Sequence, residues 1–330
     1  MSGRRLSKSA VLRGALAVLA MGQLAAGPAR AGIAAEPAAP GARAAPAGHV
    51  QASLVAEHLA LVPGRRAELG VLLAIDPGWH VYAQARNDSG LPVAVRPELP
   101  AGWVAQPLQW PAPHRHLSPG PLLDHVYEGE VLLLLPVDVP ADAPPGATIT
   151  LRAHVEWMVC QNVCLTGEAD VELALPVAGA TQESGQAPLF RATRARLPEA
   201  WPQGASAPGA AGGIPAPVSA DLQGDTIRLT APGALSITLL PAEDCVELPQ
   251  LVDEGAAQGA VLVLHLPTDR PANARLRGCV EVLFPAEPAR DAASPRIVAL
   301  DLPVGKTSAV PRIPADAGNP PSPSPTEGEH

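Results

Sequence analysis

Proline and glycine recur along the whole chain, and together they limit what it can fold into. They number 40 and 30 of the 330 residues. Proline interrupts helices and central strands, and glycine favours turns, so this abundance excludes long helices and favours short strands joined by turns. Hydrophobic residues still make up 47% of the chain, which is enough to build a core. The sequence therefore predicts an all-β fold with room for about two domains.

The first 31 residues have the pattern of a secretory signal peptide. Four basic residues precede an apolar run over residues 14–27, and Ala29-Arg30-Ala31 provides a small-residue cleavage signal. The run is shorter than the roughly 20 residues that a membrane-spanning helix needs. We expect cleavage after Ala31 and export to the periplasm, where the oxidising environment allows disulfides to form.

The net charge of −9 excludes one class of function. There are 23 basic and 32 acidic side chains, so the chain offers no basic surplus for a nucleic-acid-binding face. We therefore expect no nucleic-acid partner.

Two β-rich regions alternate with segments rich in Pro, Gly, Ala and Ser. Runs of period-two hydrophobicity predict two tandem β-sandwich domains, with no strand–helix alternation to suggest a parallel sheet. The predicted organisation is a signal peptide at 1–31, a disordered lead-in at 32–49, a first sandwich at 50–178, a linker with a short helix at 179–217, a second sandwich at 218–304 and a disordered tail at 305–330. The predicted strands are 51–61, 66–75, 92–98, 131–139, 148–159, 169–177, 218–222, 226–230, 235–240, 260–266, 276–284 and 297–302.

A cysteine hairpin is the most informative motif. Apolar and polar residues alternate before Cys160 and after Cys164, which predicts two antiparallel strands joined by the loop 161–163. Opposed cysteines at a hairpin end lie within disulfide range, and both sulfurs fall on the polar face. The same register sets Arg152 opposite Glu172, His154 opposite Asp170, and Glu156 opposite Glu168, the last an unfavourable pair that a bulge at Gly167 would relieve.

The residues alone leave three interpretations of this cysteine pair: a redox-active pair, a structural staple, or metal ligands. A staple across so short a loop gains little chain entropy, whereas sulfurs on a polar face suit exchange, so we favour the redox pair. The acidic residues Glu156, Glu168 and Asp170 disfavour a thiolate, which predicts slow exchange away from a docked partner.

Several motifs in a fixed order carry a family resemblance. The chain resembles the periplasmic amino-terminal domain of the DsbD-type thiol:disulfide interchange reductases, particularly the branch linked to suppression of copper sensitivity and so to copper tolerance. The resemblance covers about residues 50–178 well and 187–303 loosely. The motifs are Pro77-Gly78-Trp79-His80-Val81-Tyr82, Asp88-Ser89-Gly90-Leu91-Pro92, Gln109-Trp110-Pro111-Ala112-Pro113, Tyr127-Glu128-Gly129-Glu130, and Trp157-Met158-Val159-Cys160 with Cys164.

The resemblance implies an immunoglobulin-like fold and a redox-active pair that works without a bound cofactor. It implies a membrane thiol reductase as electron donor, and thioredoxin-like or disulfide-isomerase proteins of the periplasm as acceptors. By position, Cys164 matches the cysteine that forms the mixed disulfide, and Cys160 matches the one that resolves it. Those reductases continue into a membrane domain and a thioredoxin-like domain, and we expect this chain to act without them.

The resemblance also assigns residues around the pair. Family members shield the cysteines with a capping loop, and better-known members carry an aromatic residue where Val126 stands, so we expect weaker shielding here. The matching positions are Asp124, His125, Val126, Tyr127 and Glu128 for the cap, and His80 and Tyr82 for rings that line the site.

Two further groups of residues have the composition of a disulfide or of a metal site. A bond between Cys245 and Cys279 would close a loop of about 35 residues and contribute about 4 kcal/mol, so we predict a structural disulfide, with free thiols as the alternative. A second group has the composition of a copper or zinc site, but its prolines predict a loop, so we interpret its members as surface histidines and predict no metal site. These residues are His114, His116, His125 and His154.

The sequence thus predicts a periplasmic thiol–disulfide oxidoreductase that relays electrons through Cys160 and Cys164. The alternative is a non-catalytic periplasmic binding or copper-handling module whose cysteines are structural.

Overall fold

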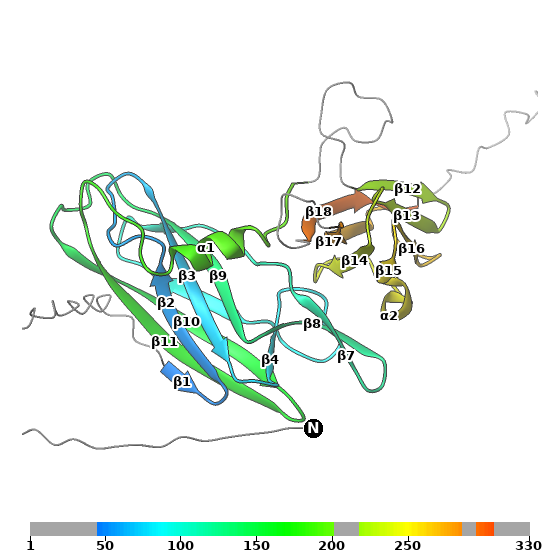
Figure 1. Ribbon diagram of the computed structural model, residues 1–330, viewed down its shortest axis with the longest axis horizontal. Coiled ribbons are helices and arrows are strands. Elements are labelled where there is room, and N and C mark those ends of the chain that lie inside the picture. Colours follow the sequence, from blue (N-terminus) through cyan, green and yellow to red (C-terminus); the bar gives the residue numbers. More distant parts are fainter. Residues whose placement is uncertain (1–44, 201–217, 286–294, 307–330) are drawn as a thin grey trace, which may run out of the picture. The chain divides into compact units, whose positions relative to one another are not determined.

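The computed structural model describes residues 45–200, 218–285 and 295–306, and in these residues the fold is almost entirely β (Figure 1). The prediction of an all-β, immunoglobulin-like chain is confirmed. Within the described residues, no helix is both long and apolar enough to cross a membrane. The predicted signal peptide and tail lie largely outside the described residues, as does the linker from residue 201 to 217.

The first sandwich contains two antiparallel sheets. One has the order β1-β2-β3-β9-β6, and the other has the order β11-β10-β4-β8-β7 with β5 paired to β10. The strands of the first sheet are β1 (Ala45–Ala47), β2 (Val50–Ala56), β3 (Arg66–Ile75), β6 (Val104–Ala105) and β9 (Glu130–Asp138). The strands of the second sheet are β4 (His80–Tyr82), β5 (Ala94–Glu98), β7 (His114–Ser118), β8 (Leu122–Glu128), β10 (Thr148–Cys160) and β11 (Cys164–Pro176).

The inward faces of these sheets form one core. Leu69, Val71 and Leu133 come from the first sheet, and Val155 and Trp157 come from the second. Alternate residues of a strand point to opposite faces, so the period-two pattern of β10 and β11 places every second side chain in this core. The core therefore fixes the register of the hairpin that carries the first two cysteines.

Strand β9 departs from alternation because both of its faces are buried. Leu133 and Leu135 lie in the core, whereas Leu132 and Leu134 pack with Phe190 of α1 (Ala187–Arg194) on the outer face. A strand covered on both faces reads as a continuous apolar run. The short helix predicted in the linker is present as α1, and it packs on the outer face of the first sandwich.

The second sandwich pairs a three-stranded sheet, β12-β13-β16, with a four-stranded sheet, β15-β14-β17-β18. Leu229, Leu264, Leu276 and Val280 contribute to the apolar cluster between these strands. The elements are β12 (Ser219–Gln223), β13 (Thr226–Thr230), β14 (Ser236–Pro241), α2 (Leu251–Glu254), β15 (Ala256–Gln258), β16 (Val261–His265), β17 (Arg275–Leu283) and β18 (Arg296–Pro303).

Two local predictions are wrong. The lead-in at 32–49 was expected to be disordered throughout, but its last part, Ala45–Ala47, pairs with β2. Gly48 and His49 both have positive φ, which is the geometry of a tight two-residue hairpin turn. The prolines around residues 111–119 suggested a loop, but His114–Ser118 is strand β7, which pairs with β8 at the sheet edge where proline is tolerated.

Candidate redox site

The hairpin of β10 and β11 presents the first cysteine pair at its tip. Cys160 ends β10, Cys164 begins β11, and the two are joined by a disulfide. The two residues are direct cross-strand partners, as predicted. The other predicted pairs also occur, with Arg152 Nε donating to Glu172 at 3.2 Å and His154 Nδ1 lying 2.7 Å from Asp170.

The unfavourable Glu156–Glu168 pair is relieved in a way the sequence did not predict. No bulge interrupts the hairpin, because Trp157 pairs directly with Gly167. Instead Arg96, from the neighbouring strand β5, donates to Glu156 at 2.6 Å. Gly167 serves another purpose: an added Cβ would lie 2.6 Å from Trp157 Nε1, so only glycine leaves room for the buried indole.

Four strands bring four functional residues into one row. Glu128 of β8 pairs with His80 of β4, His80 pairs with Cys160 of β10, and Cys160 pairs with Cys164 of β11. Directly opposed residues in antiparallel strands project from the same face of the sheet. The row therefore crosses the sheet from β8 to β11 on its outer face, away from the core.

The two sulfurs differ in access. Cys160 is only 3% exposed and packs with Tyr82 and Val126, whereas Cys164 is exposed. The Tyr82 hydroxyl lies 4.0 Å from Cys164 Sγ. A reagent or protein partner approaching the hairpin tip therefore meets Cys164 first.

A loop at 87–91 covers the tyrosine side of the site. An added Cβ on Gly90 would lie 2.0 Å from the Tyr82 ring, so the loop backbone rests directly on that ring. Asp124, which is buried, holds the loop by accepting hydrogen bonds from the Ser89 amide at 3.0 Å and from the Ser89 hydroxyl at 2.6 Å. The sequence motif around Ser89 does not by itself predict this covering role.

The segment expected to be a capping loop is part of the sheet. Residues 124–128 form most of β8, and their alternation divides them between two faces. Val126 packs beside Tyr82 and Cys160, whereas Tyr127 lies in the core and donates a hydrogen bond to the Pro111 carbonyl at 2.6 Å. Tyr127 therefore does not cover the sulfurs.

Burial shifts the pKa values of the two rings beside the disulfide, His80 and Tyr82. Burial, and next the neighbouring His116, lowers the pKa of His80, so its imidazole is neutral at pH 7. Burial also raises the pKa of Tyr82, so its hydroxyl stays protonated. Neither ring therefore places a positive charge next to the sulfurs to favour a thiolate.

The predicted Cys245–Cys279 disulfide is absent, and both residues are buried free thiols. Cys279 packs with Leu240 and Ile297, whereas Cys245 lies in the cluster that contains Val280. Consecutive residues of a strand point to opposite faces, so Cys279 points away from the face on which Cys245 lies. Burial raises the pKa of both thiols, that of Cys279 to about 12.

The histidines considered as metal ligands do not come together as a group. His125 is fully buried with Nδ1 2.6 Å from the Arg86 carbonyl, and His154 is paired with Asp170. His116 instead lies beside His80, with ring centroids 4.5 Å apart, and beside Glu128. No local sequence pattern predicts this juxtaposition, because its members come from three strands.

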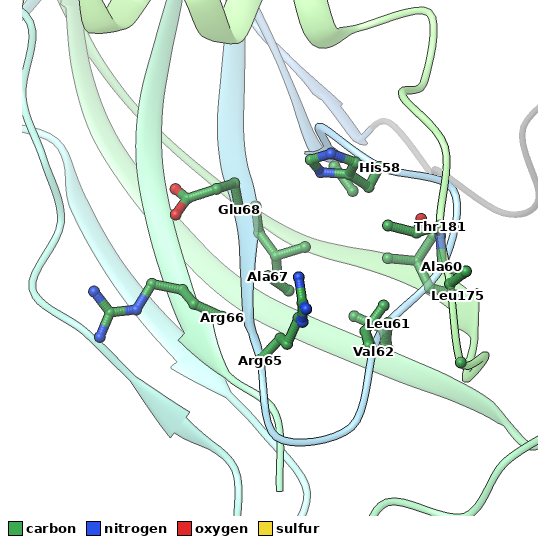
Figure 2. Close-up of a pocket in the computed structure, with 14 residues that line it drawn as sticks. His58, Ala60, Leu61, Val62, Arg65, Arg66, Ala67, Glu68, Leu175 and Thr181 are labelled. Atoms are coloured by element: carbon green, nitrogen blue, oxygen red, sulfur yellow. Dashed lines mark hydrogen bonds between the residues drawn. The ribbon is translucent and has the colours of Figure 1, made fainter. Parts of the chain in front are cut away.

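A pocket of about 380 Å³ lies at the other end of the first sandwich (Figure 2). Leu175 lines it, eleven residues along β11 from Cys164 and hence about 35 Å away. In Figure 2 the side chains of Arg66 and Glu68 extend away from His58 and Thr181, so the polar groups do not converge. We assign no function to this pocket.

Comparison with known proteins finds a family match for the first sandwich. Residues 51–176 match the family described as "Thiol:disulfide interchange protein DsbD, N-terminal". The chain is similar to the N-terminal periplasmic domain of ScsB from Proteus mirabilis, with 14% identity, 79% of this chain and 95% of that chain covered, and a TM-score of 0.46. It is also similar to the Neisseria meningitidis DsbD N-terminal domain in the reduced form, with 13% identity, 39% and 89% covered, and a TM-score of 0.24. No curated protein matches the chain.

Proposed function

We propose that this chain, in which residues 51–176 form a DsbD-type N-terminal thiol–disulfide interchange module, is an electron relay of the periplasm. In this role it takes electrons from a membrane thiol reductase and passes them to oxidised thiol proteins. The observation that carries the proposal is the asymmetry of the pair, because Cys164 is exposed and Cys160 is 3% exposed.

The asymmetry gives each sulfur a part in the exchange. In the reduced protein, the Cys164 thiolate attacks a partner disulfide, forms a mixed disulfide and releases one partner thiolate. The Cys160 thiolate then attacks Cys164 Sγ, which forms the intramolecular disulfide and releases the second partner thiolate. Two electrons pass to the partner, and a donor dithiol restores the cysteines by the reverse sequence.

The surface beside Cys164 supports contact with a protein partner. Val163 and Leu165 are 60% and 42% exposed on either side of Cys164. A groove of about 820 Å³ runs along the same part of the hairpin, and its lining combines Leu91, Trp157 and Met158 with the acidic Glu156 and Glu168. Apolar groups at the rim of a reactive sulfur suit a protein substrate better than a small polar thiol.

A reduction potential tests the proposal against the alternative of a binding module with structural cysteines. An exchange-active pair equilibrates with glutathione buffers, whereas structural disulfides typically have potentials below about −300 mV. A potential below that value for the Cys160–Cys164 bond would overturn the relay.

Trapping with glutathione disulfide tests the separate parts of the two sulfurs. Cys160→Ala should accumulate one glutathione on Cys164, seen as a mass increase, because no resolving thiol remains. Cys164→Ala should react far more slowly, because Cys160 is buried. The matched control is Cys245→Ala/Cys279→Ala, which should exchange like the parent protein; loss of exchange in that variant alone would place the active pair in the second sandwich.

A further inference from the structure

We propose that His80, His116 and Glu128 form a binding site for a divalent transition-metal ion of the zinc type on the outer face of the first sandwich. One ligand atom from each residue lies within 4.8 Å of the others. His116 Nδ1 is 4.0 Å from Glu128 Oε1, and the two imidazole rings are 4.5 Å apart. The site is built from side chains other than the cysteines, and its His80 is the direct cross-strand partner of Cys160.

The topology explains why these three side chains converge. His80 and Glu128 are direct cross-strand partners in β4 and β8, so they share a face. His116 of β7 pairs with Asp124, which lies on the same face of β8 as Glu128, because the two are four residues apart. Three adjacent strands thus direct two imidazoles and one carboxylate to the same face of the sheet, where the side chains approach one another.

The spacing suits a small ion after a modest closure. Zinc ligands lie about 2.0–2.2 Å from the ion, so tetrahedral ligand atoms are about 3.3 Å apart. His80 is buried and fixes one ligand, whereas the side chains of His116 and Glu128 are 33% and 60% exposed and have room to rotate inward. Two nitrogens and one oxygen are donors that zinc and its neighbours in the first transition row accept, and three ligands leave a fourth position open.

A second cluster with the same residue types has a simpler explanation. His154, Glu156 and Glu168 are also close together. There, however, His154 Nδ1 is engaged by Asp170 at 2.7 Å, its Nε2 lies 3.5 Å from Glu156, and Arg96 neutralises Glu156. No arginine or lysine is paired with Glu128 in the part of the chain that the structure describes, so its charge remains available for a cation.

Calorimetric titration of the disulfide-bonded protein with Zn²⁺, in a form without a histidine tag, tests the site. Keeping Cys160 and Cys164 oxidised removes the thiolates as competing ligands, so a failure here would leave the relay untouched. We expect one saturable site that excess Mg²⁺ does not displace, because magnesium prefers oxygen ligands in octahedral geometry. Absence of saturable binding, or displacement by Mg²⁺, would overturn the proposal.

Variants on exposed positions keep the test separate from folding. Glu128→Gln and His116→Gln should each weaken Zn²⁺ binding at least tenfold. The matched control is His114→Gln, which removes an exposed imidazole two residues away on the same strand and outside the trio, and which should bind within twofold of the parent protein. Equal losses in all three variants would indicate scattered binding to surface histidines, and unchanged binding in Glu128→Gln and His116→Gln would assign the ion to other residues; either result refutes the site.

Discussion

Each sandwich contains two cysteines, but their settings are opposite. Cys160 and Cys164 lie four residues apart at a hairpin tip and are bonded, and one of the two residues is exposed. Cys245 and Cys279 are buried and unbonded, and they belong to different apolar clusters. The comparison shows that strand register decides which cysteines meet, and that burial decides which of them can react.

The largest expected effect is in the rates of thiol alkylation. At pH 8 a thiol with a pKa of about 12 is ionised in roughly one molecule in ten thousand, and thiolates are the reacting species. In the reduced native protein, iodoacetamide should therefore modify Cys164 at least a thousandfold faster than Cys279. Peptide mass spectrometry after timed quenching measures both rates.

Denaturation provides the control for this comparison. In strong denaturant all four thiols should react at similar rates, since burial no longer distinguishes them. Native-state modification of Cys279 at a rate near that of Cys164 would show that the second pair is accessible, and the contrast between the sandwiches would fail.

A smaller effect, this time on the free energy of unfolding, is expected from filling the space beside the Trp157 indole in the redox hairpin. Gly167→Ala would bring a methyl group to 2.6 Å from Trp157 Nε1, which is closer than such atoms can approach. We expect a loss of about 1–3 kcal/mol in the free energy of unfolding, measured by chemical denaturation. Gly179→Ala is the control, because nothing lies within 4 Å of its added Cβ; equal stability of the two variants would contradict this account of Gly167.

Removing a buried thiol of the second sandwich should have a modest effect on stability. Cys279→Ala should lower the free energy of unfolding by on the order of 1 kcal/mol, because a packed sulfur is lost, and not by the larger amount expected for a broken long-loop disulfide. Exchange through Cys164 should be unchanged. Equal stability loss under oxidising and reducing conditions is the decisive result, and a loss seen only under oxidising conditions would mean that Cys245 and Cys279 pair after all.

The register of the hairpin could be predicted because its information is local, although the bulge expected at Gly167 does not occur. Period-two alternation on both arms fixes which residues face the core, and the two cysteines then fix the register. The paired residues Arg152 and Glu172 therefore lie where the sequence placed them. The continuous run 131–139 was also readable as a strand.

The rest of the site could not be predicted, because it depends on contacts between segments far apart in the chain. Strand β4 has only three residues, and β7 lies among prolines, so neither has enough pattern to reveal its partner. The meeting of His80 with Glu128 and Cys160 follows from sheet order, which no local window contains. The prediction of a Cys245–Cys279 disulfide failed for a related reason. The length of the loop determines how much a bond would stabilise the fold, but it does not determine on which faces of the sheet the two sulfurs lie.

The smallest expected effect concerns a pair on the exposed side of the redox hairpin. The hydrogen bond with Asp170 is the main cause that raises the pKa of His154 above its usual 6.5. A histidine whose pKa is higher in the folded state stabilises the fold fully below pH 6.5, and this contribution is lost as the pH rises through the folded pKa. The stability difference between the parent protein and His154→Gln, measured by denaturation, should therefore be larger at pH 5.5 than at pH 8.5. Asp170→Asn supplies the control, since without the carboxylate the same difference should vary much less with pH; an equal dependence in that background would show that Asp170 is not its source.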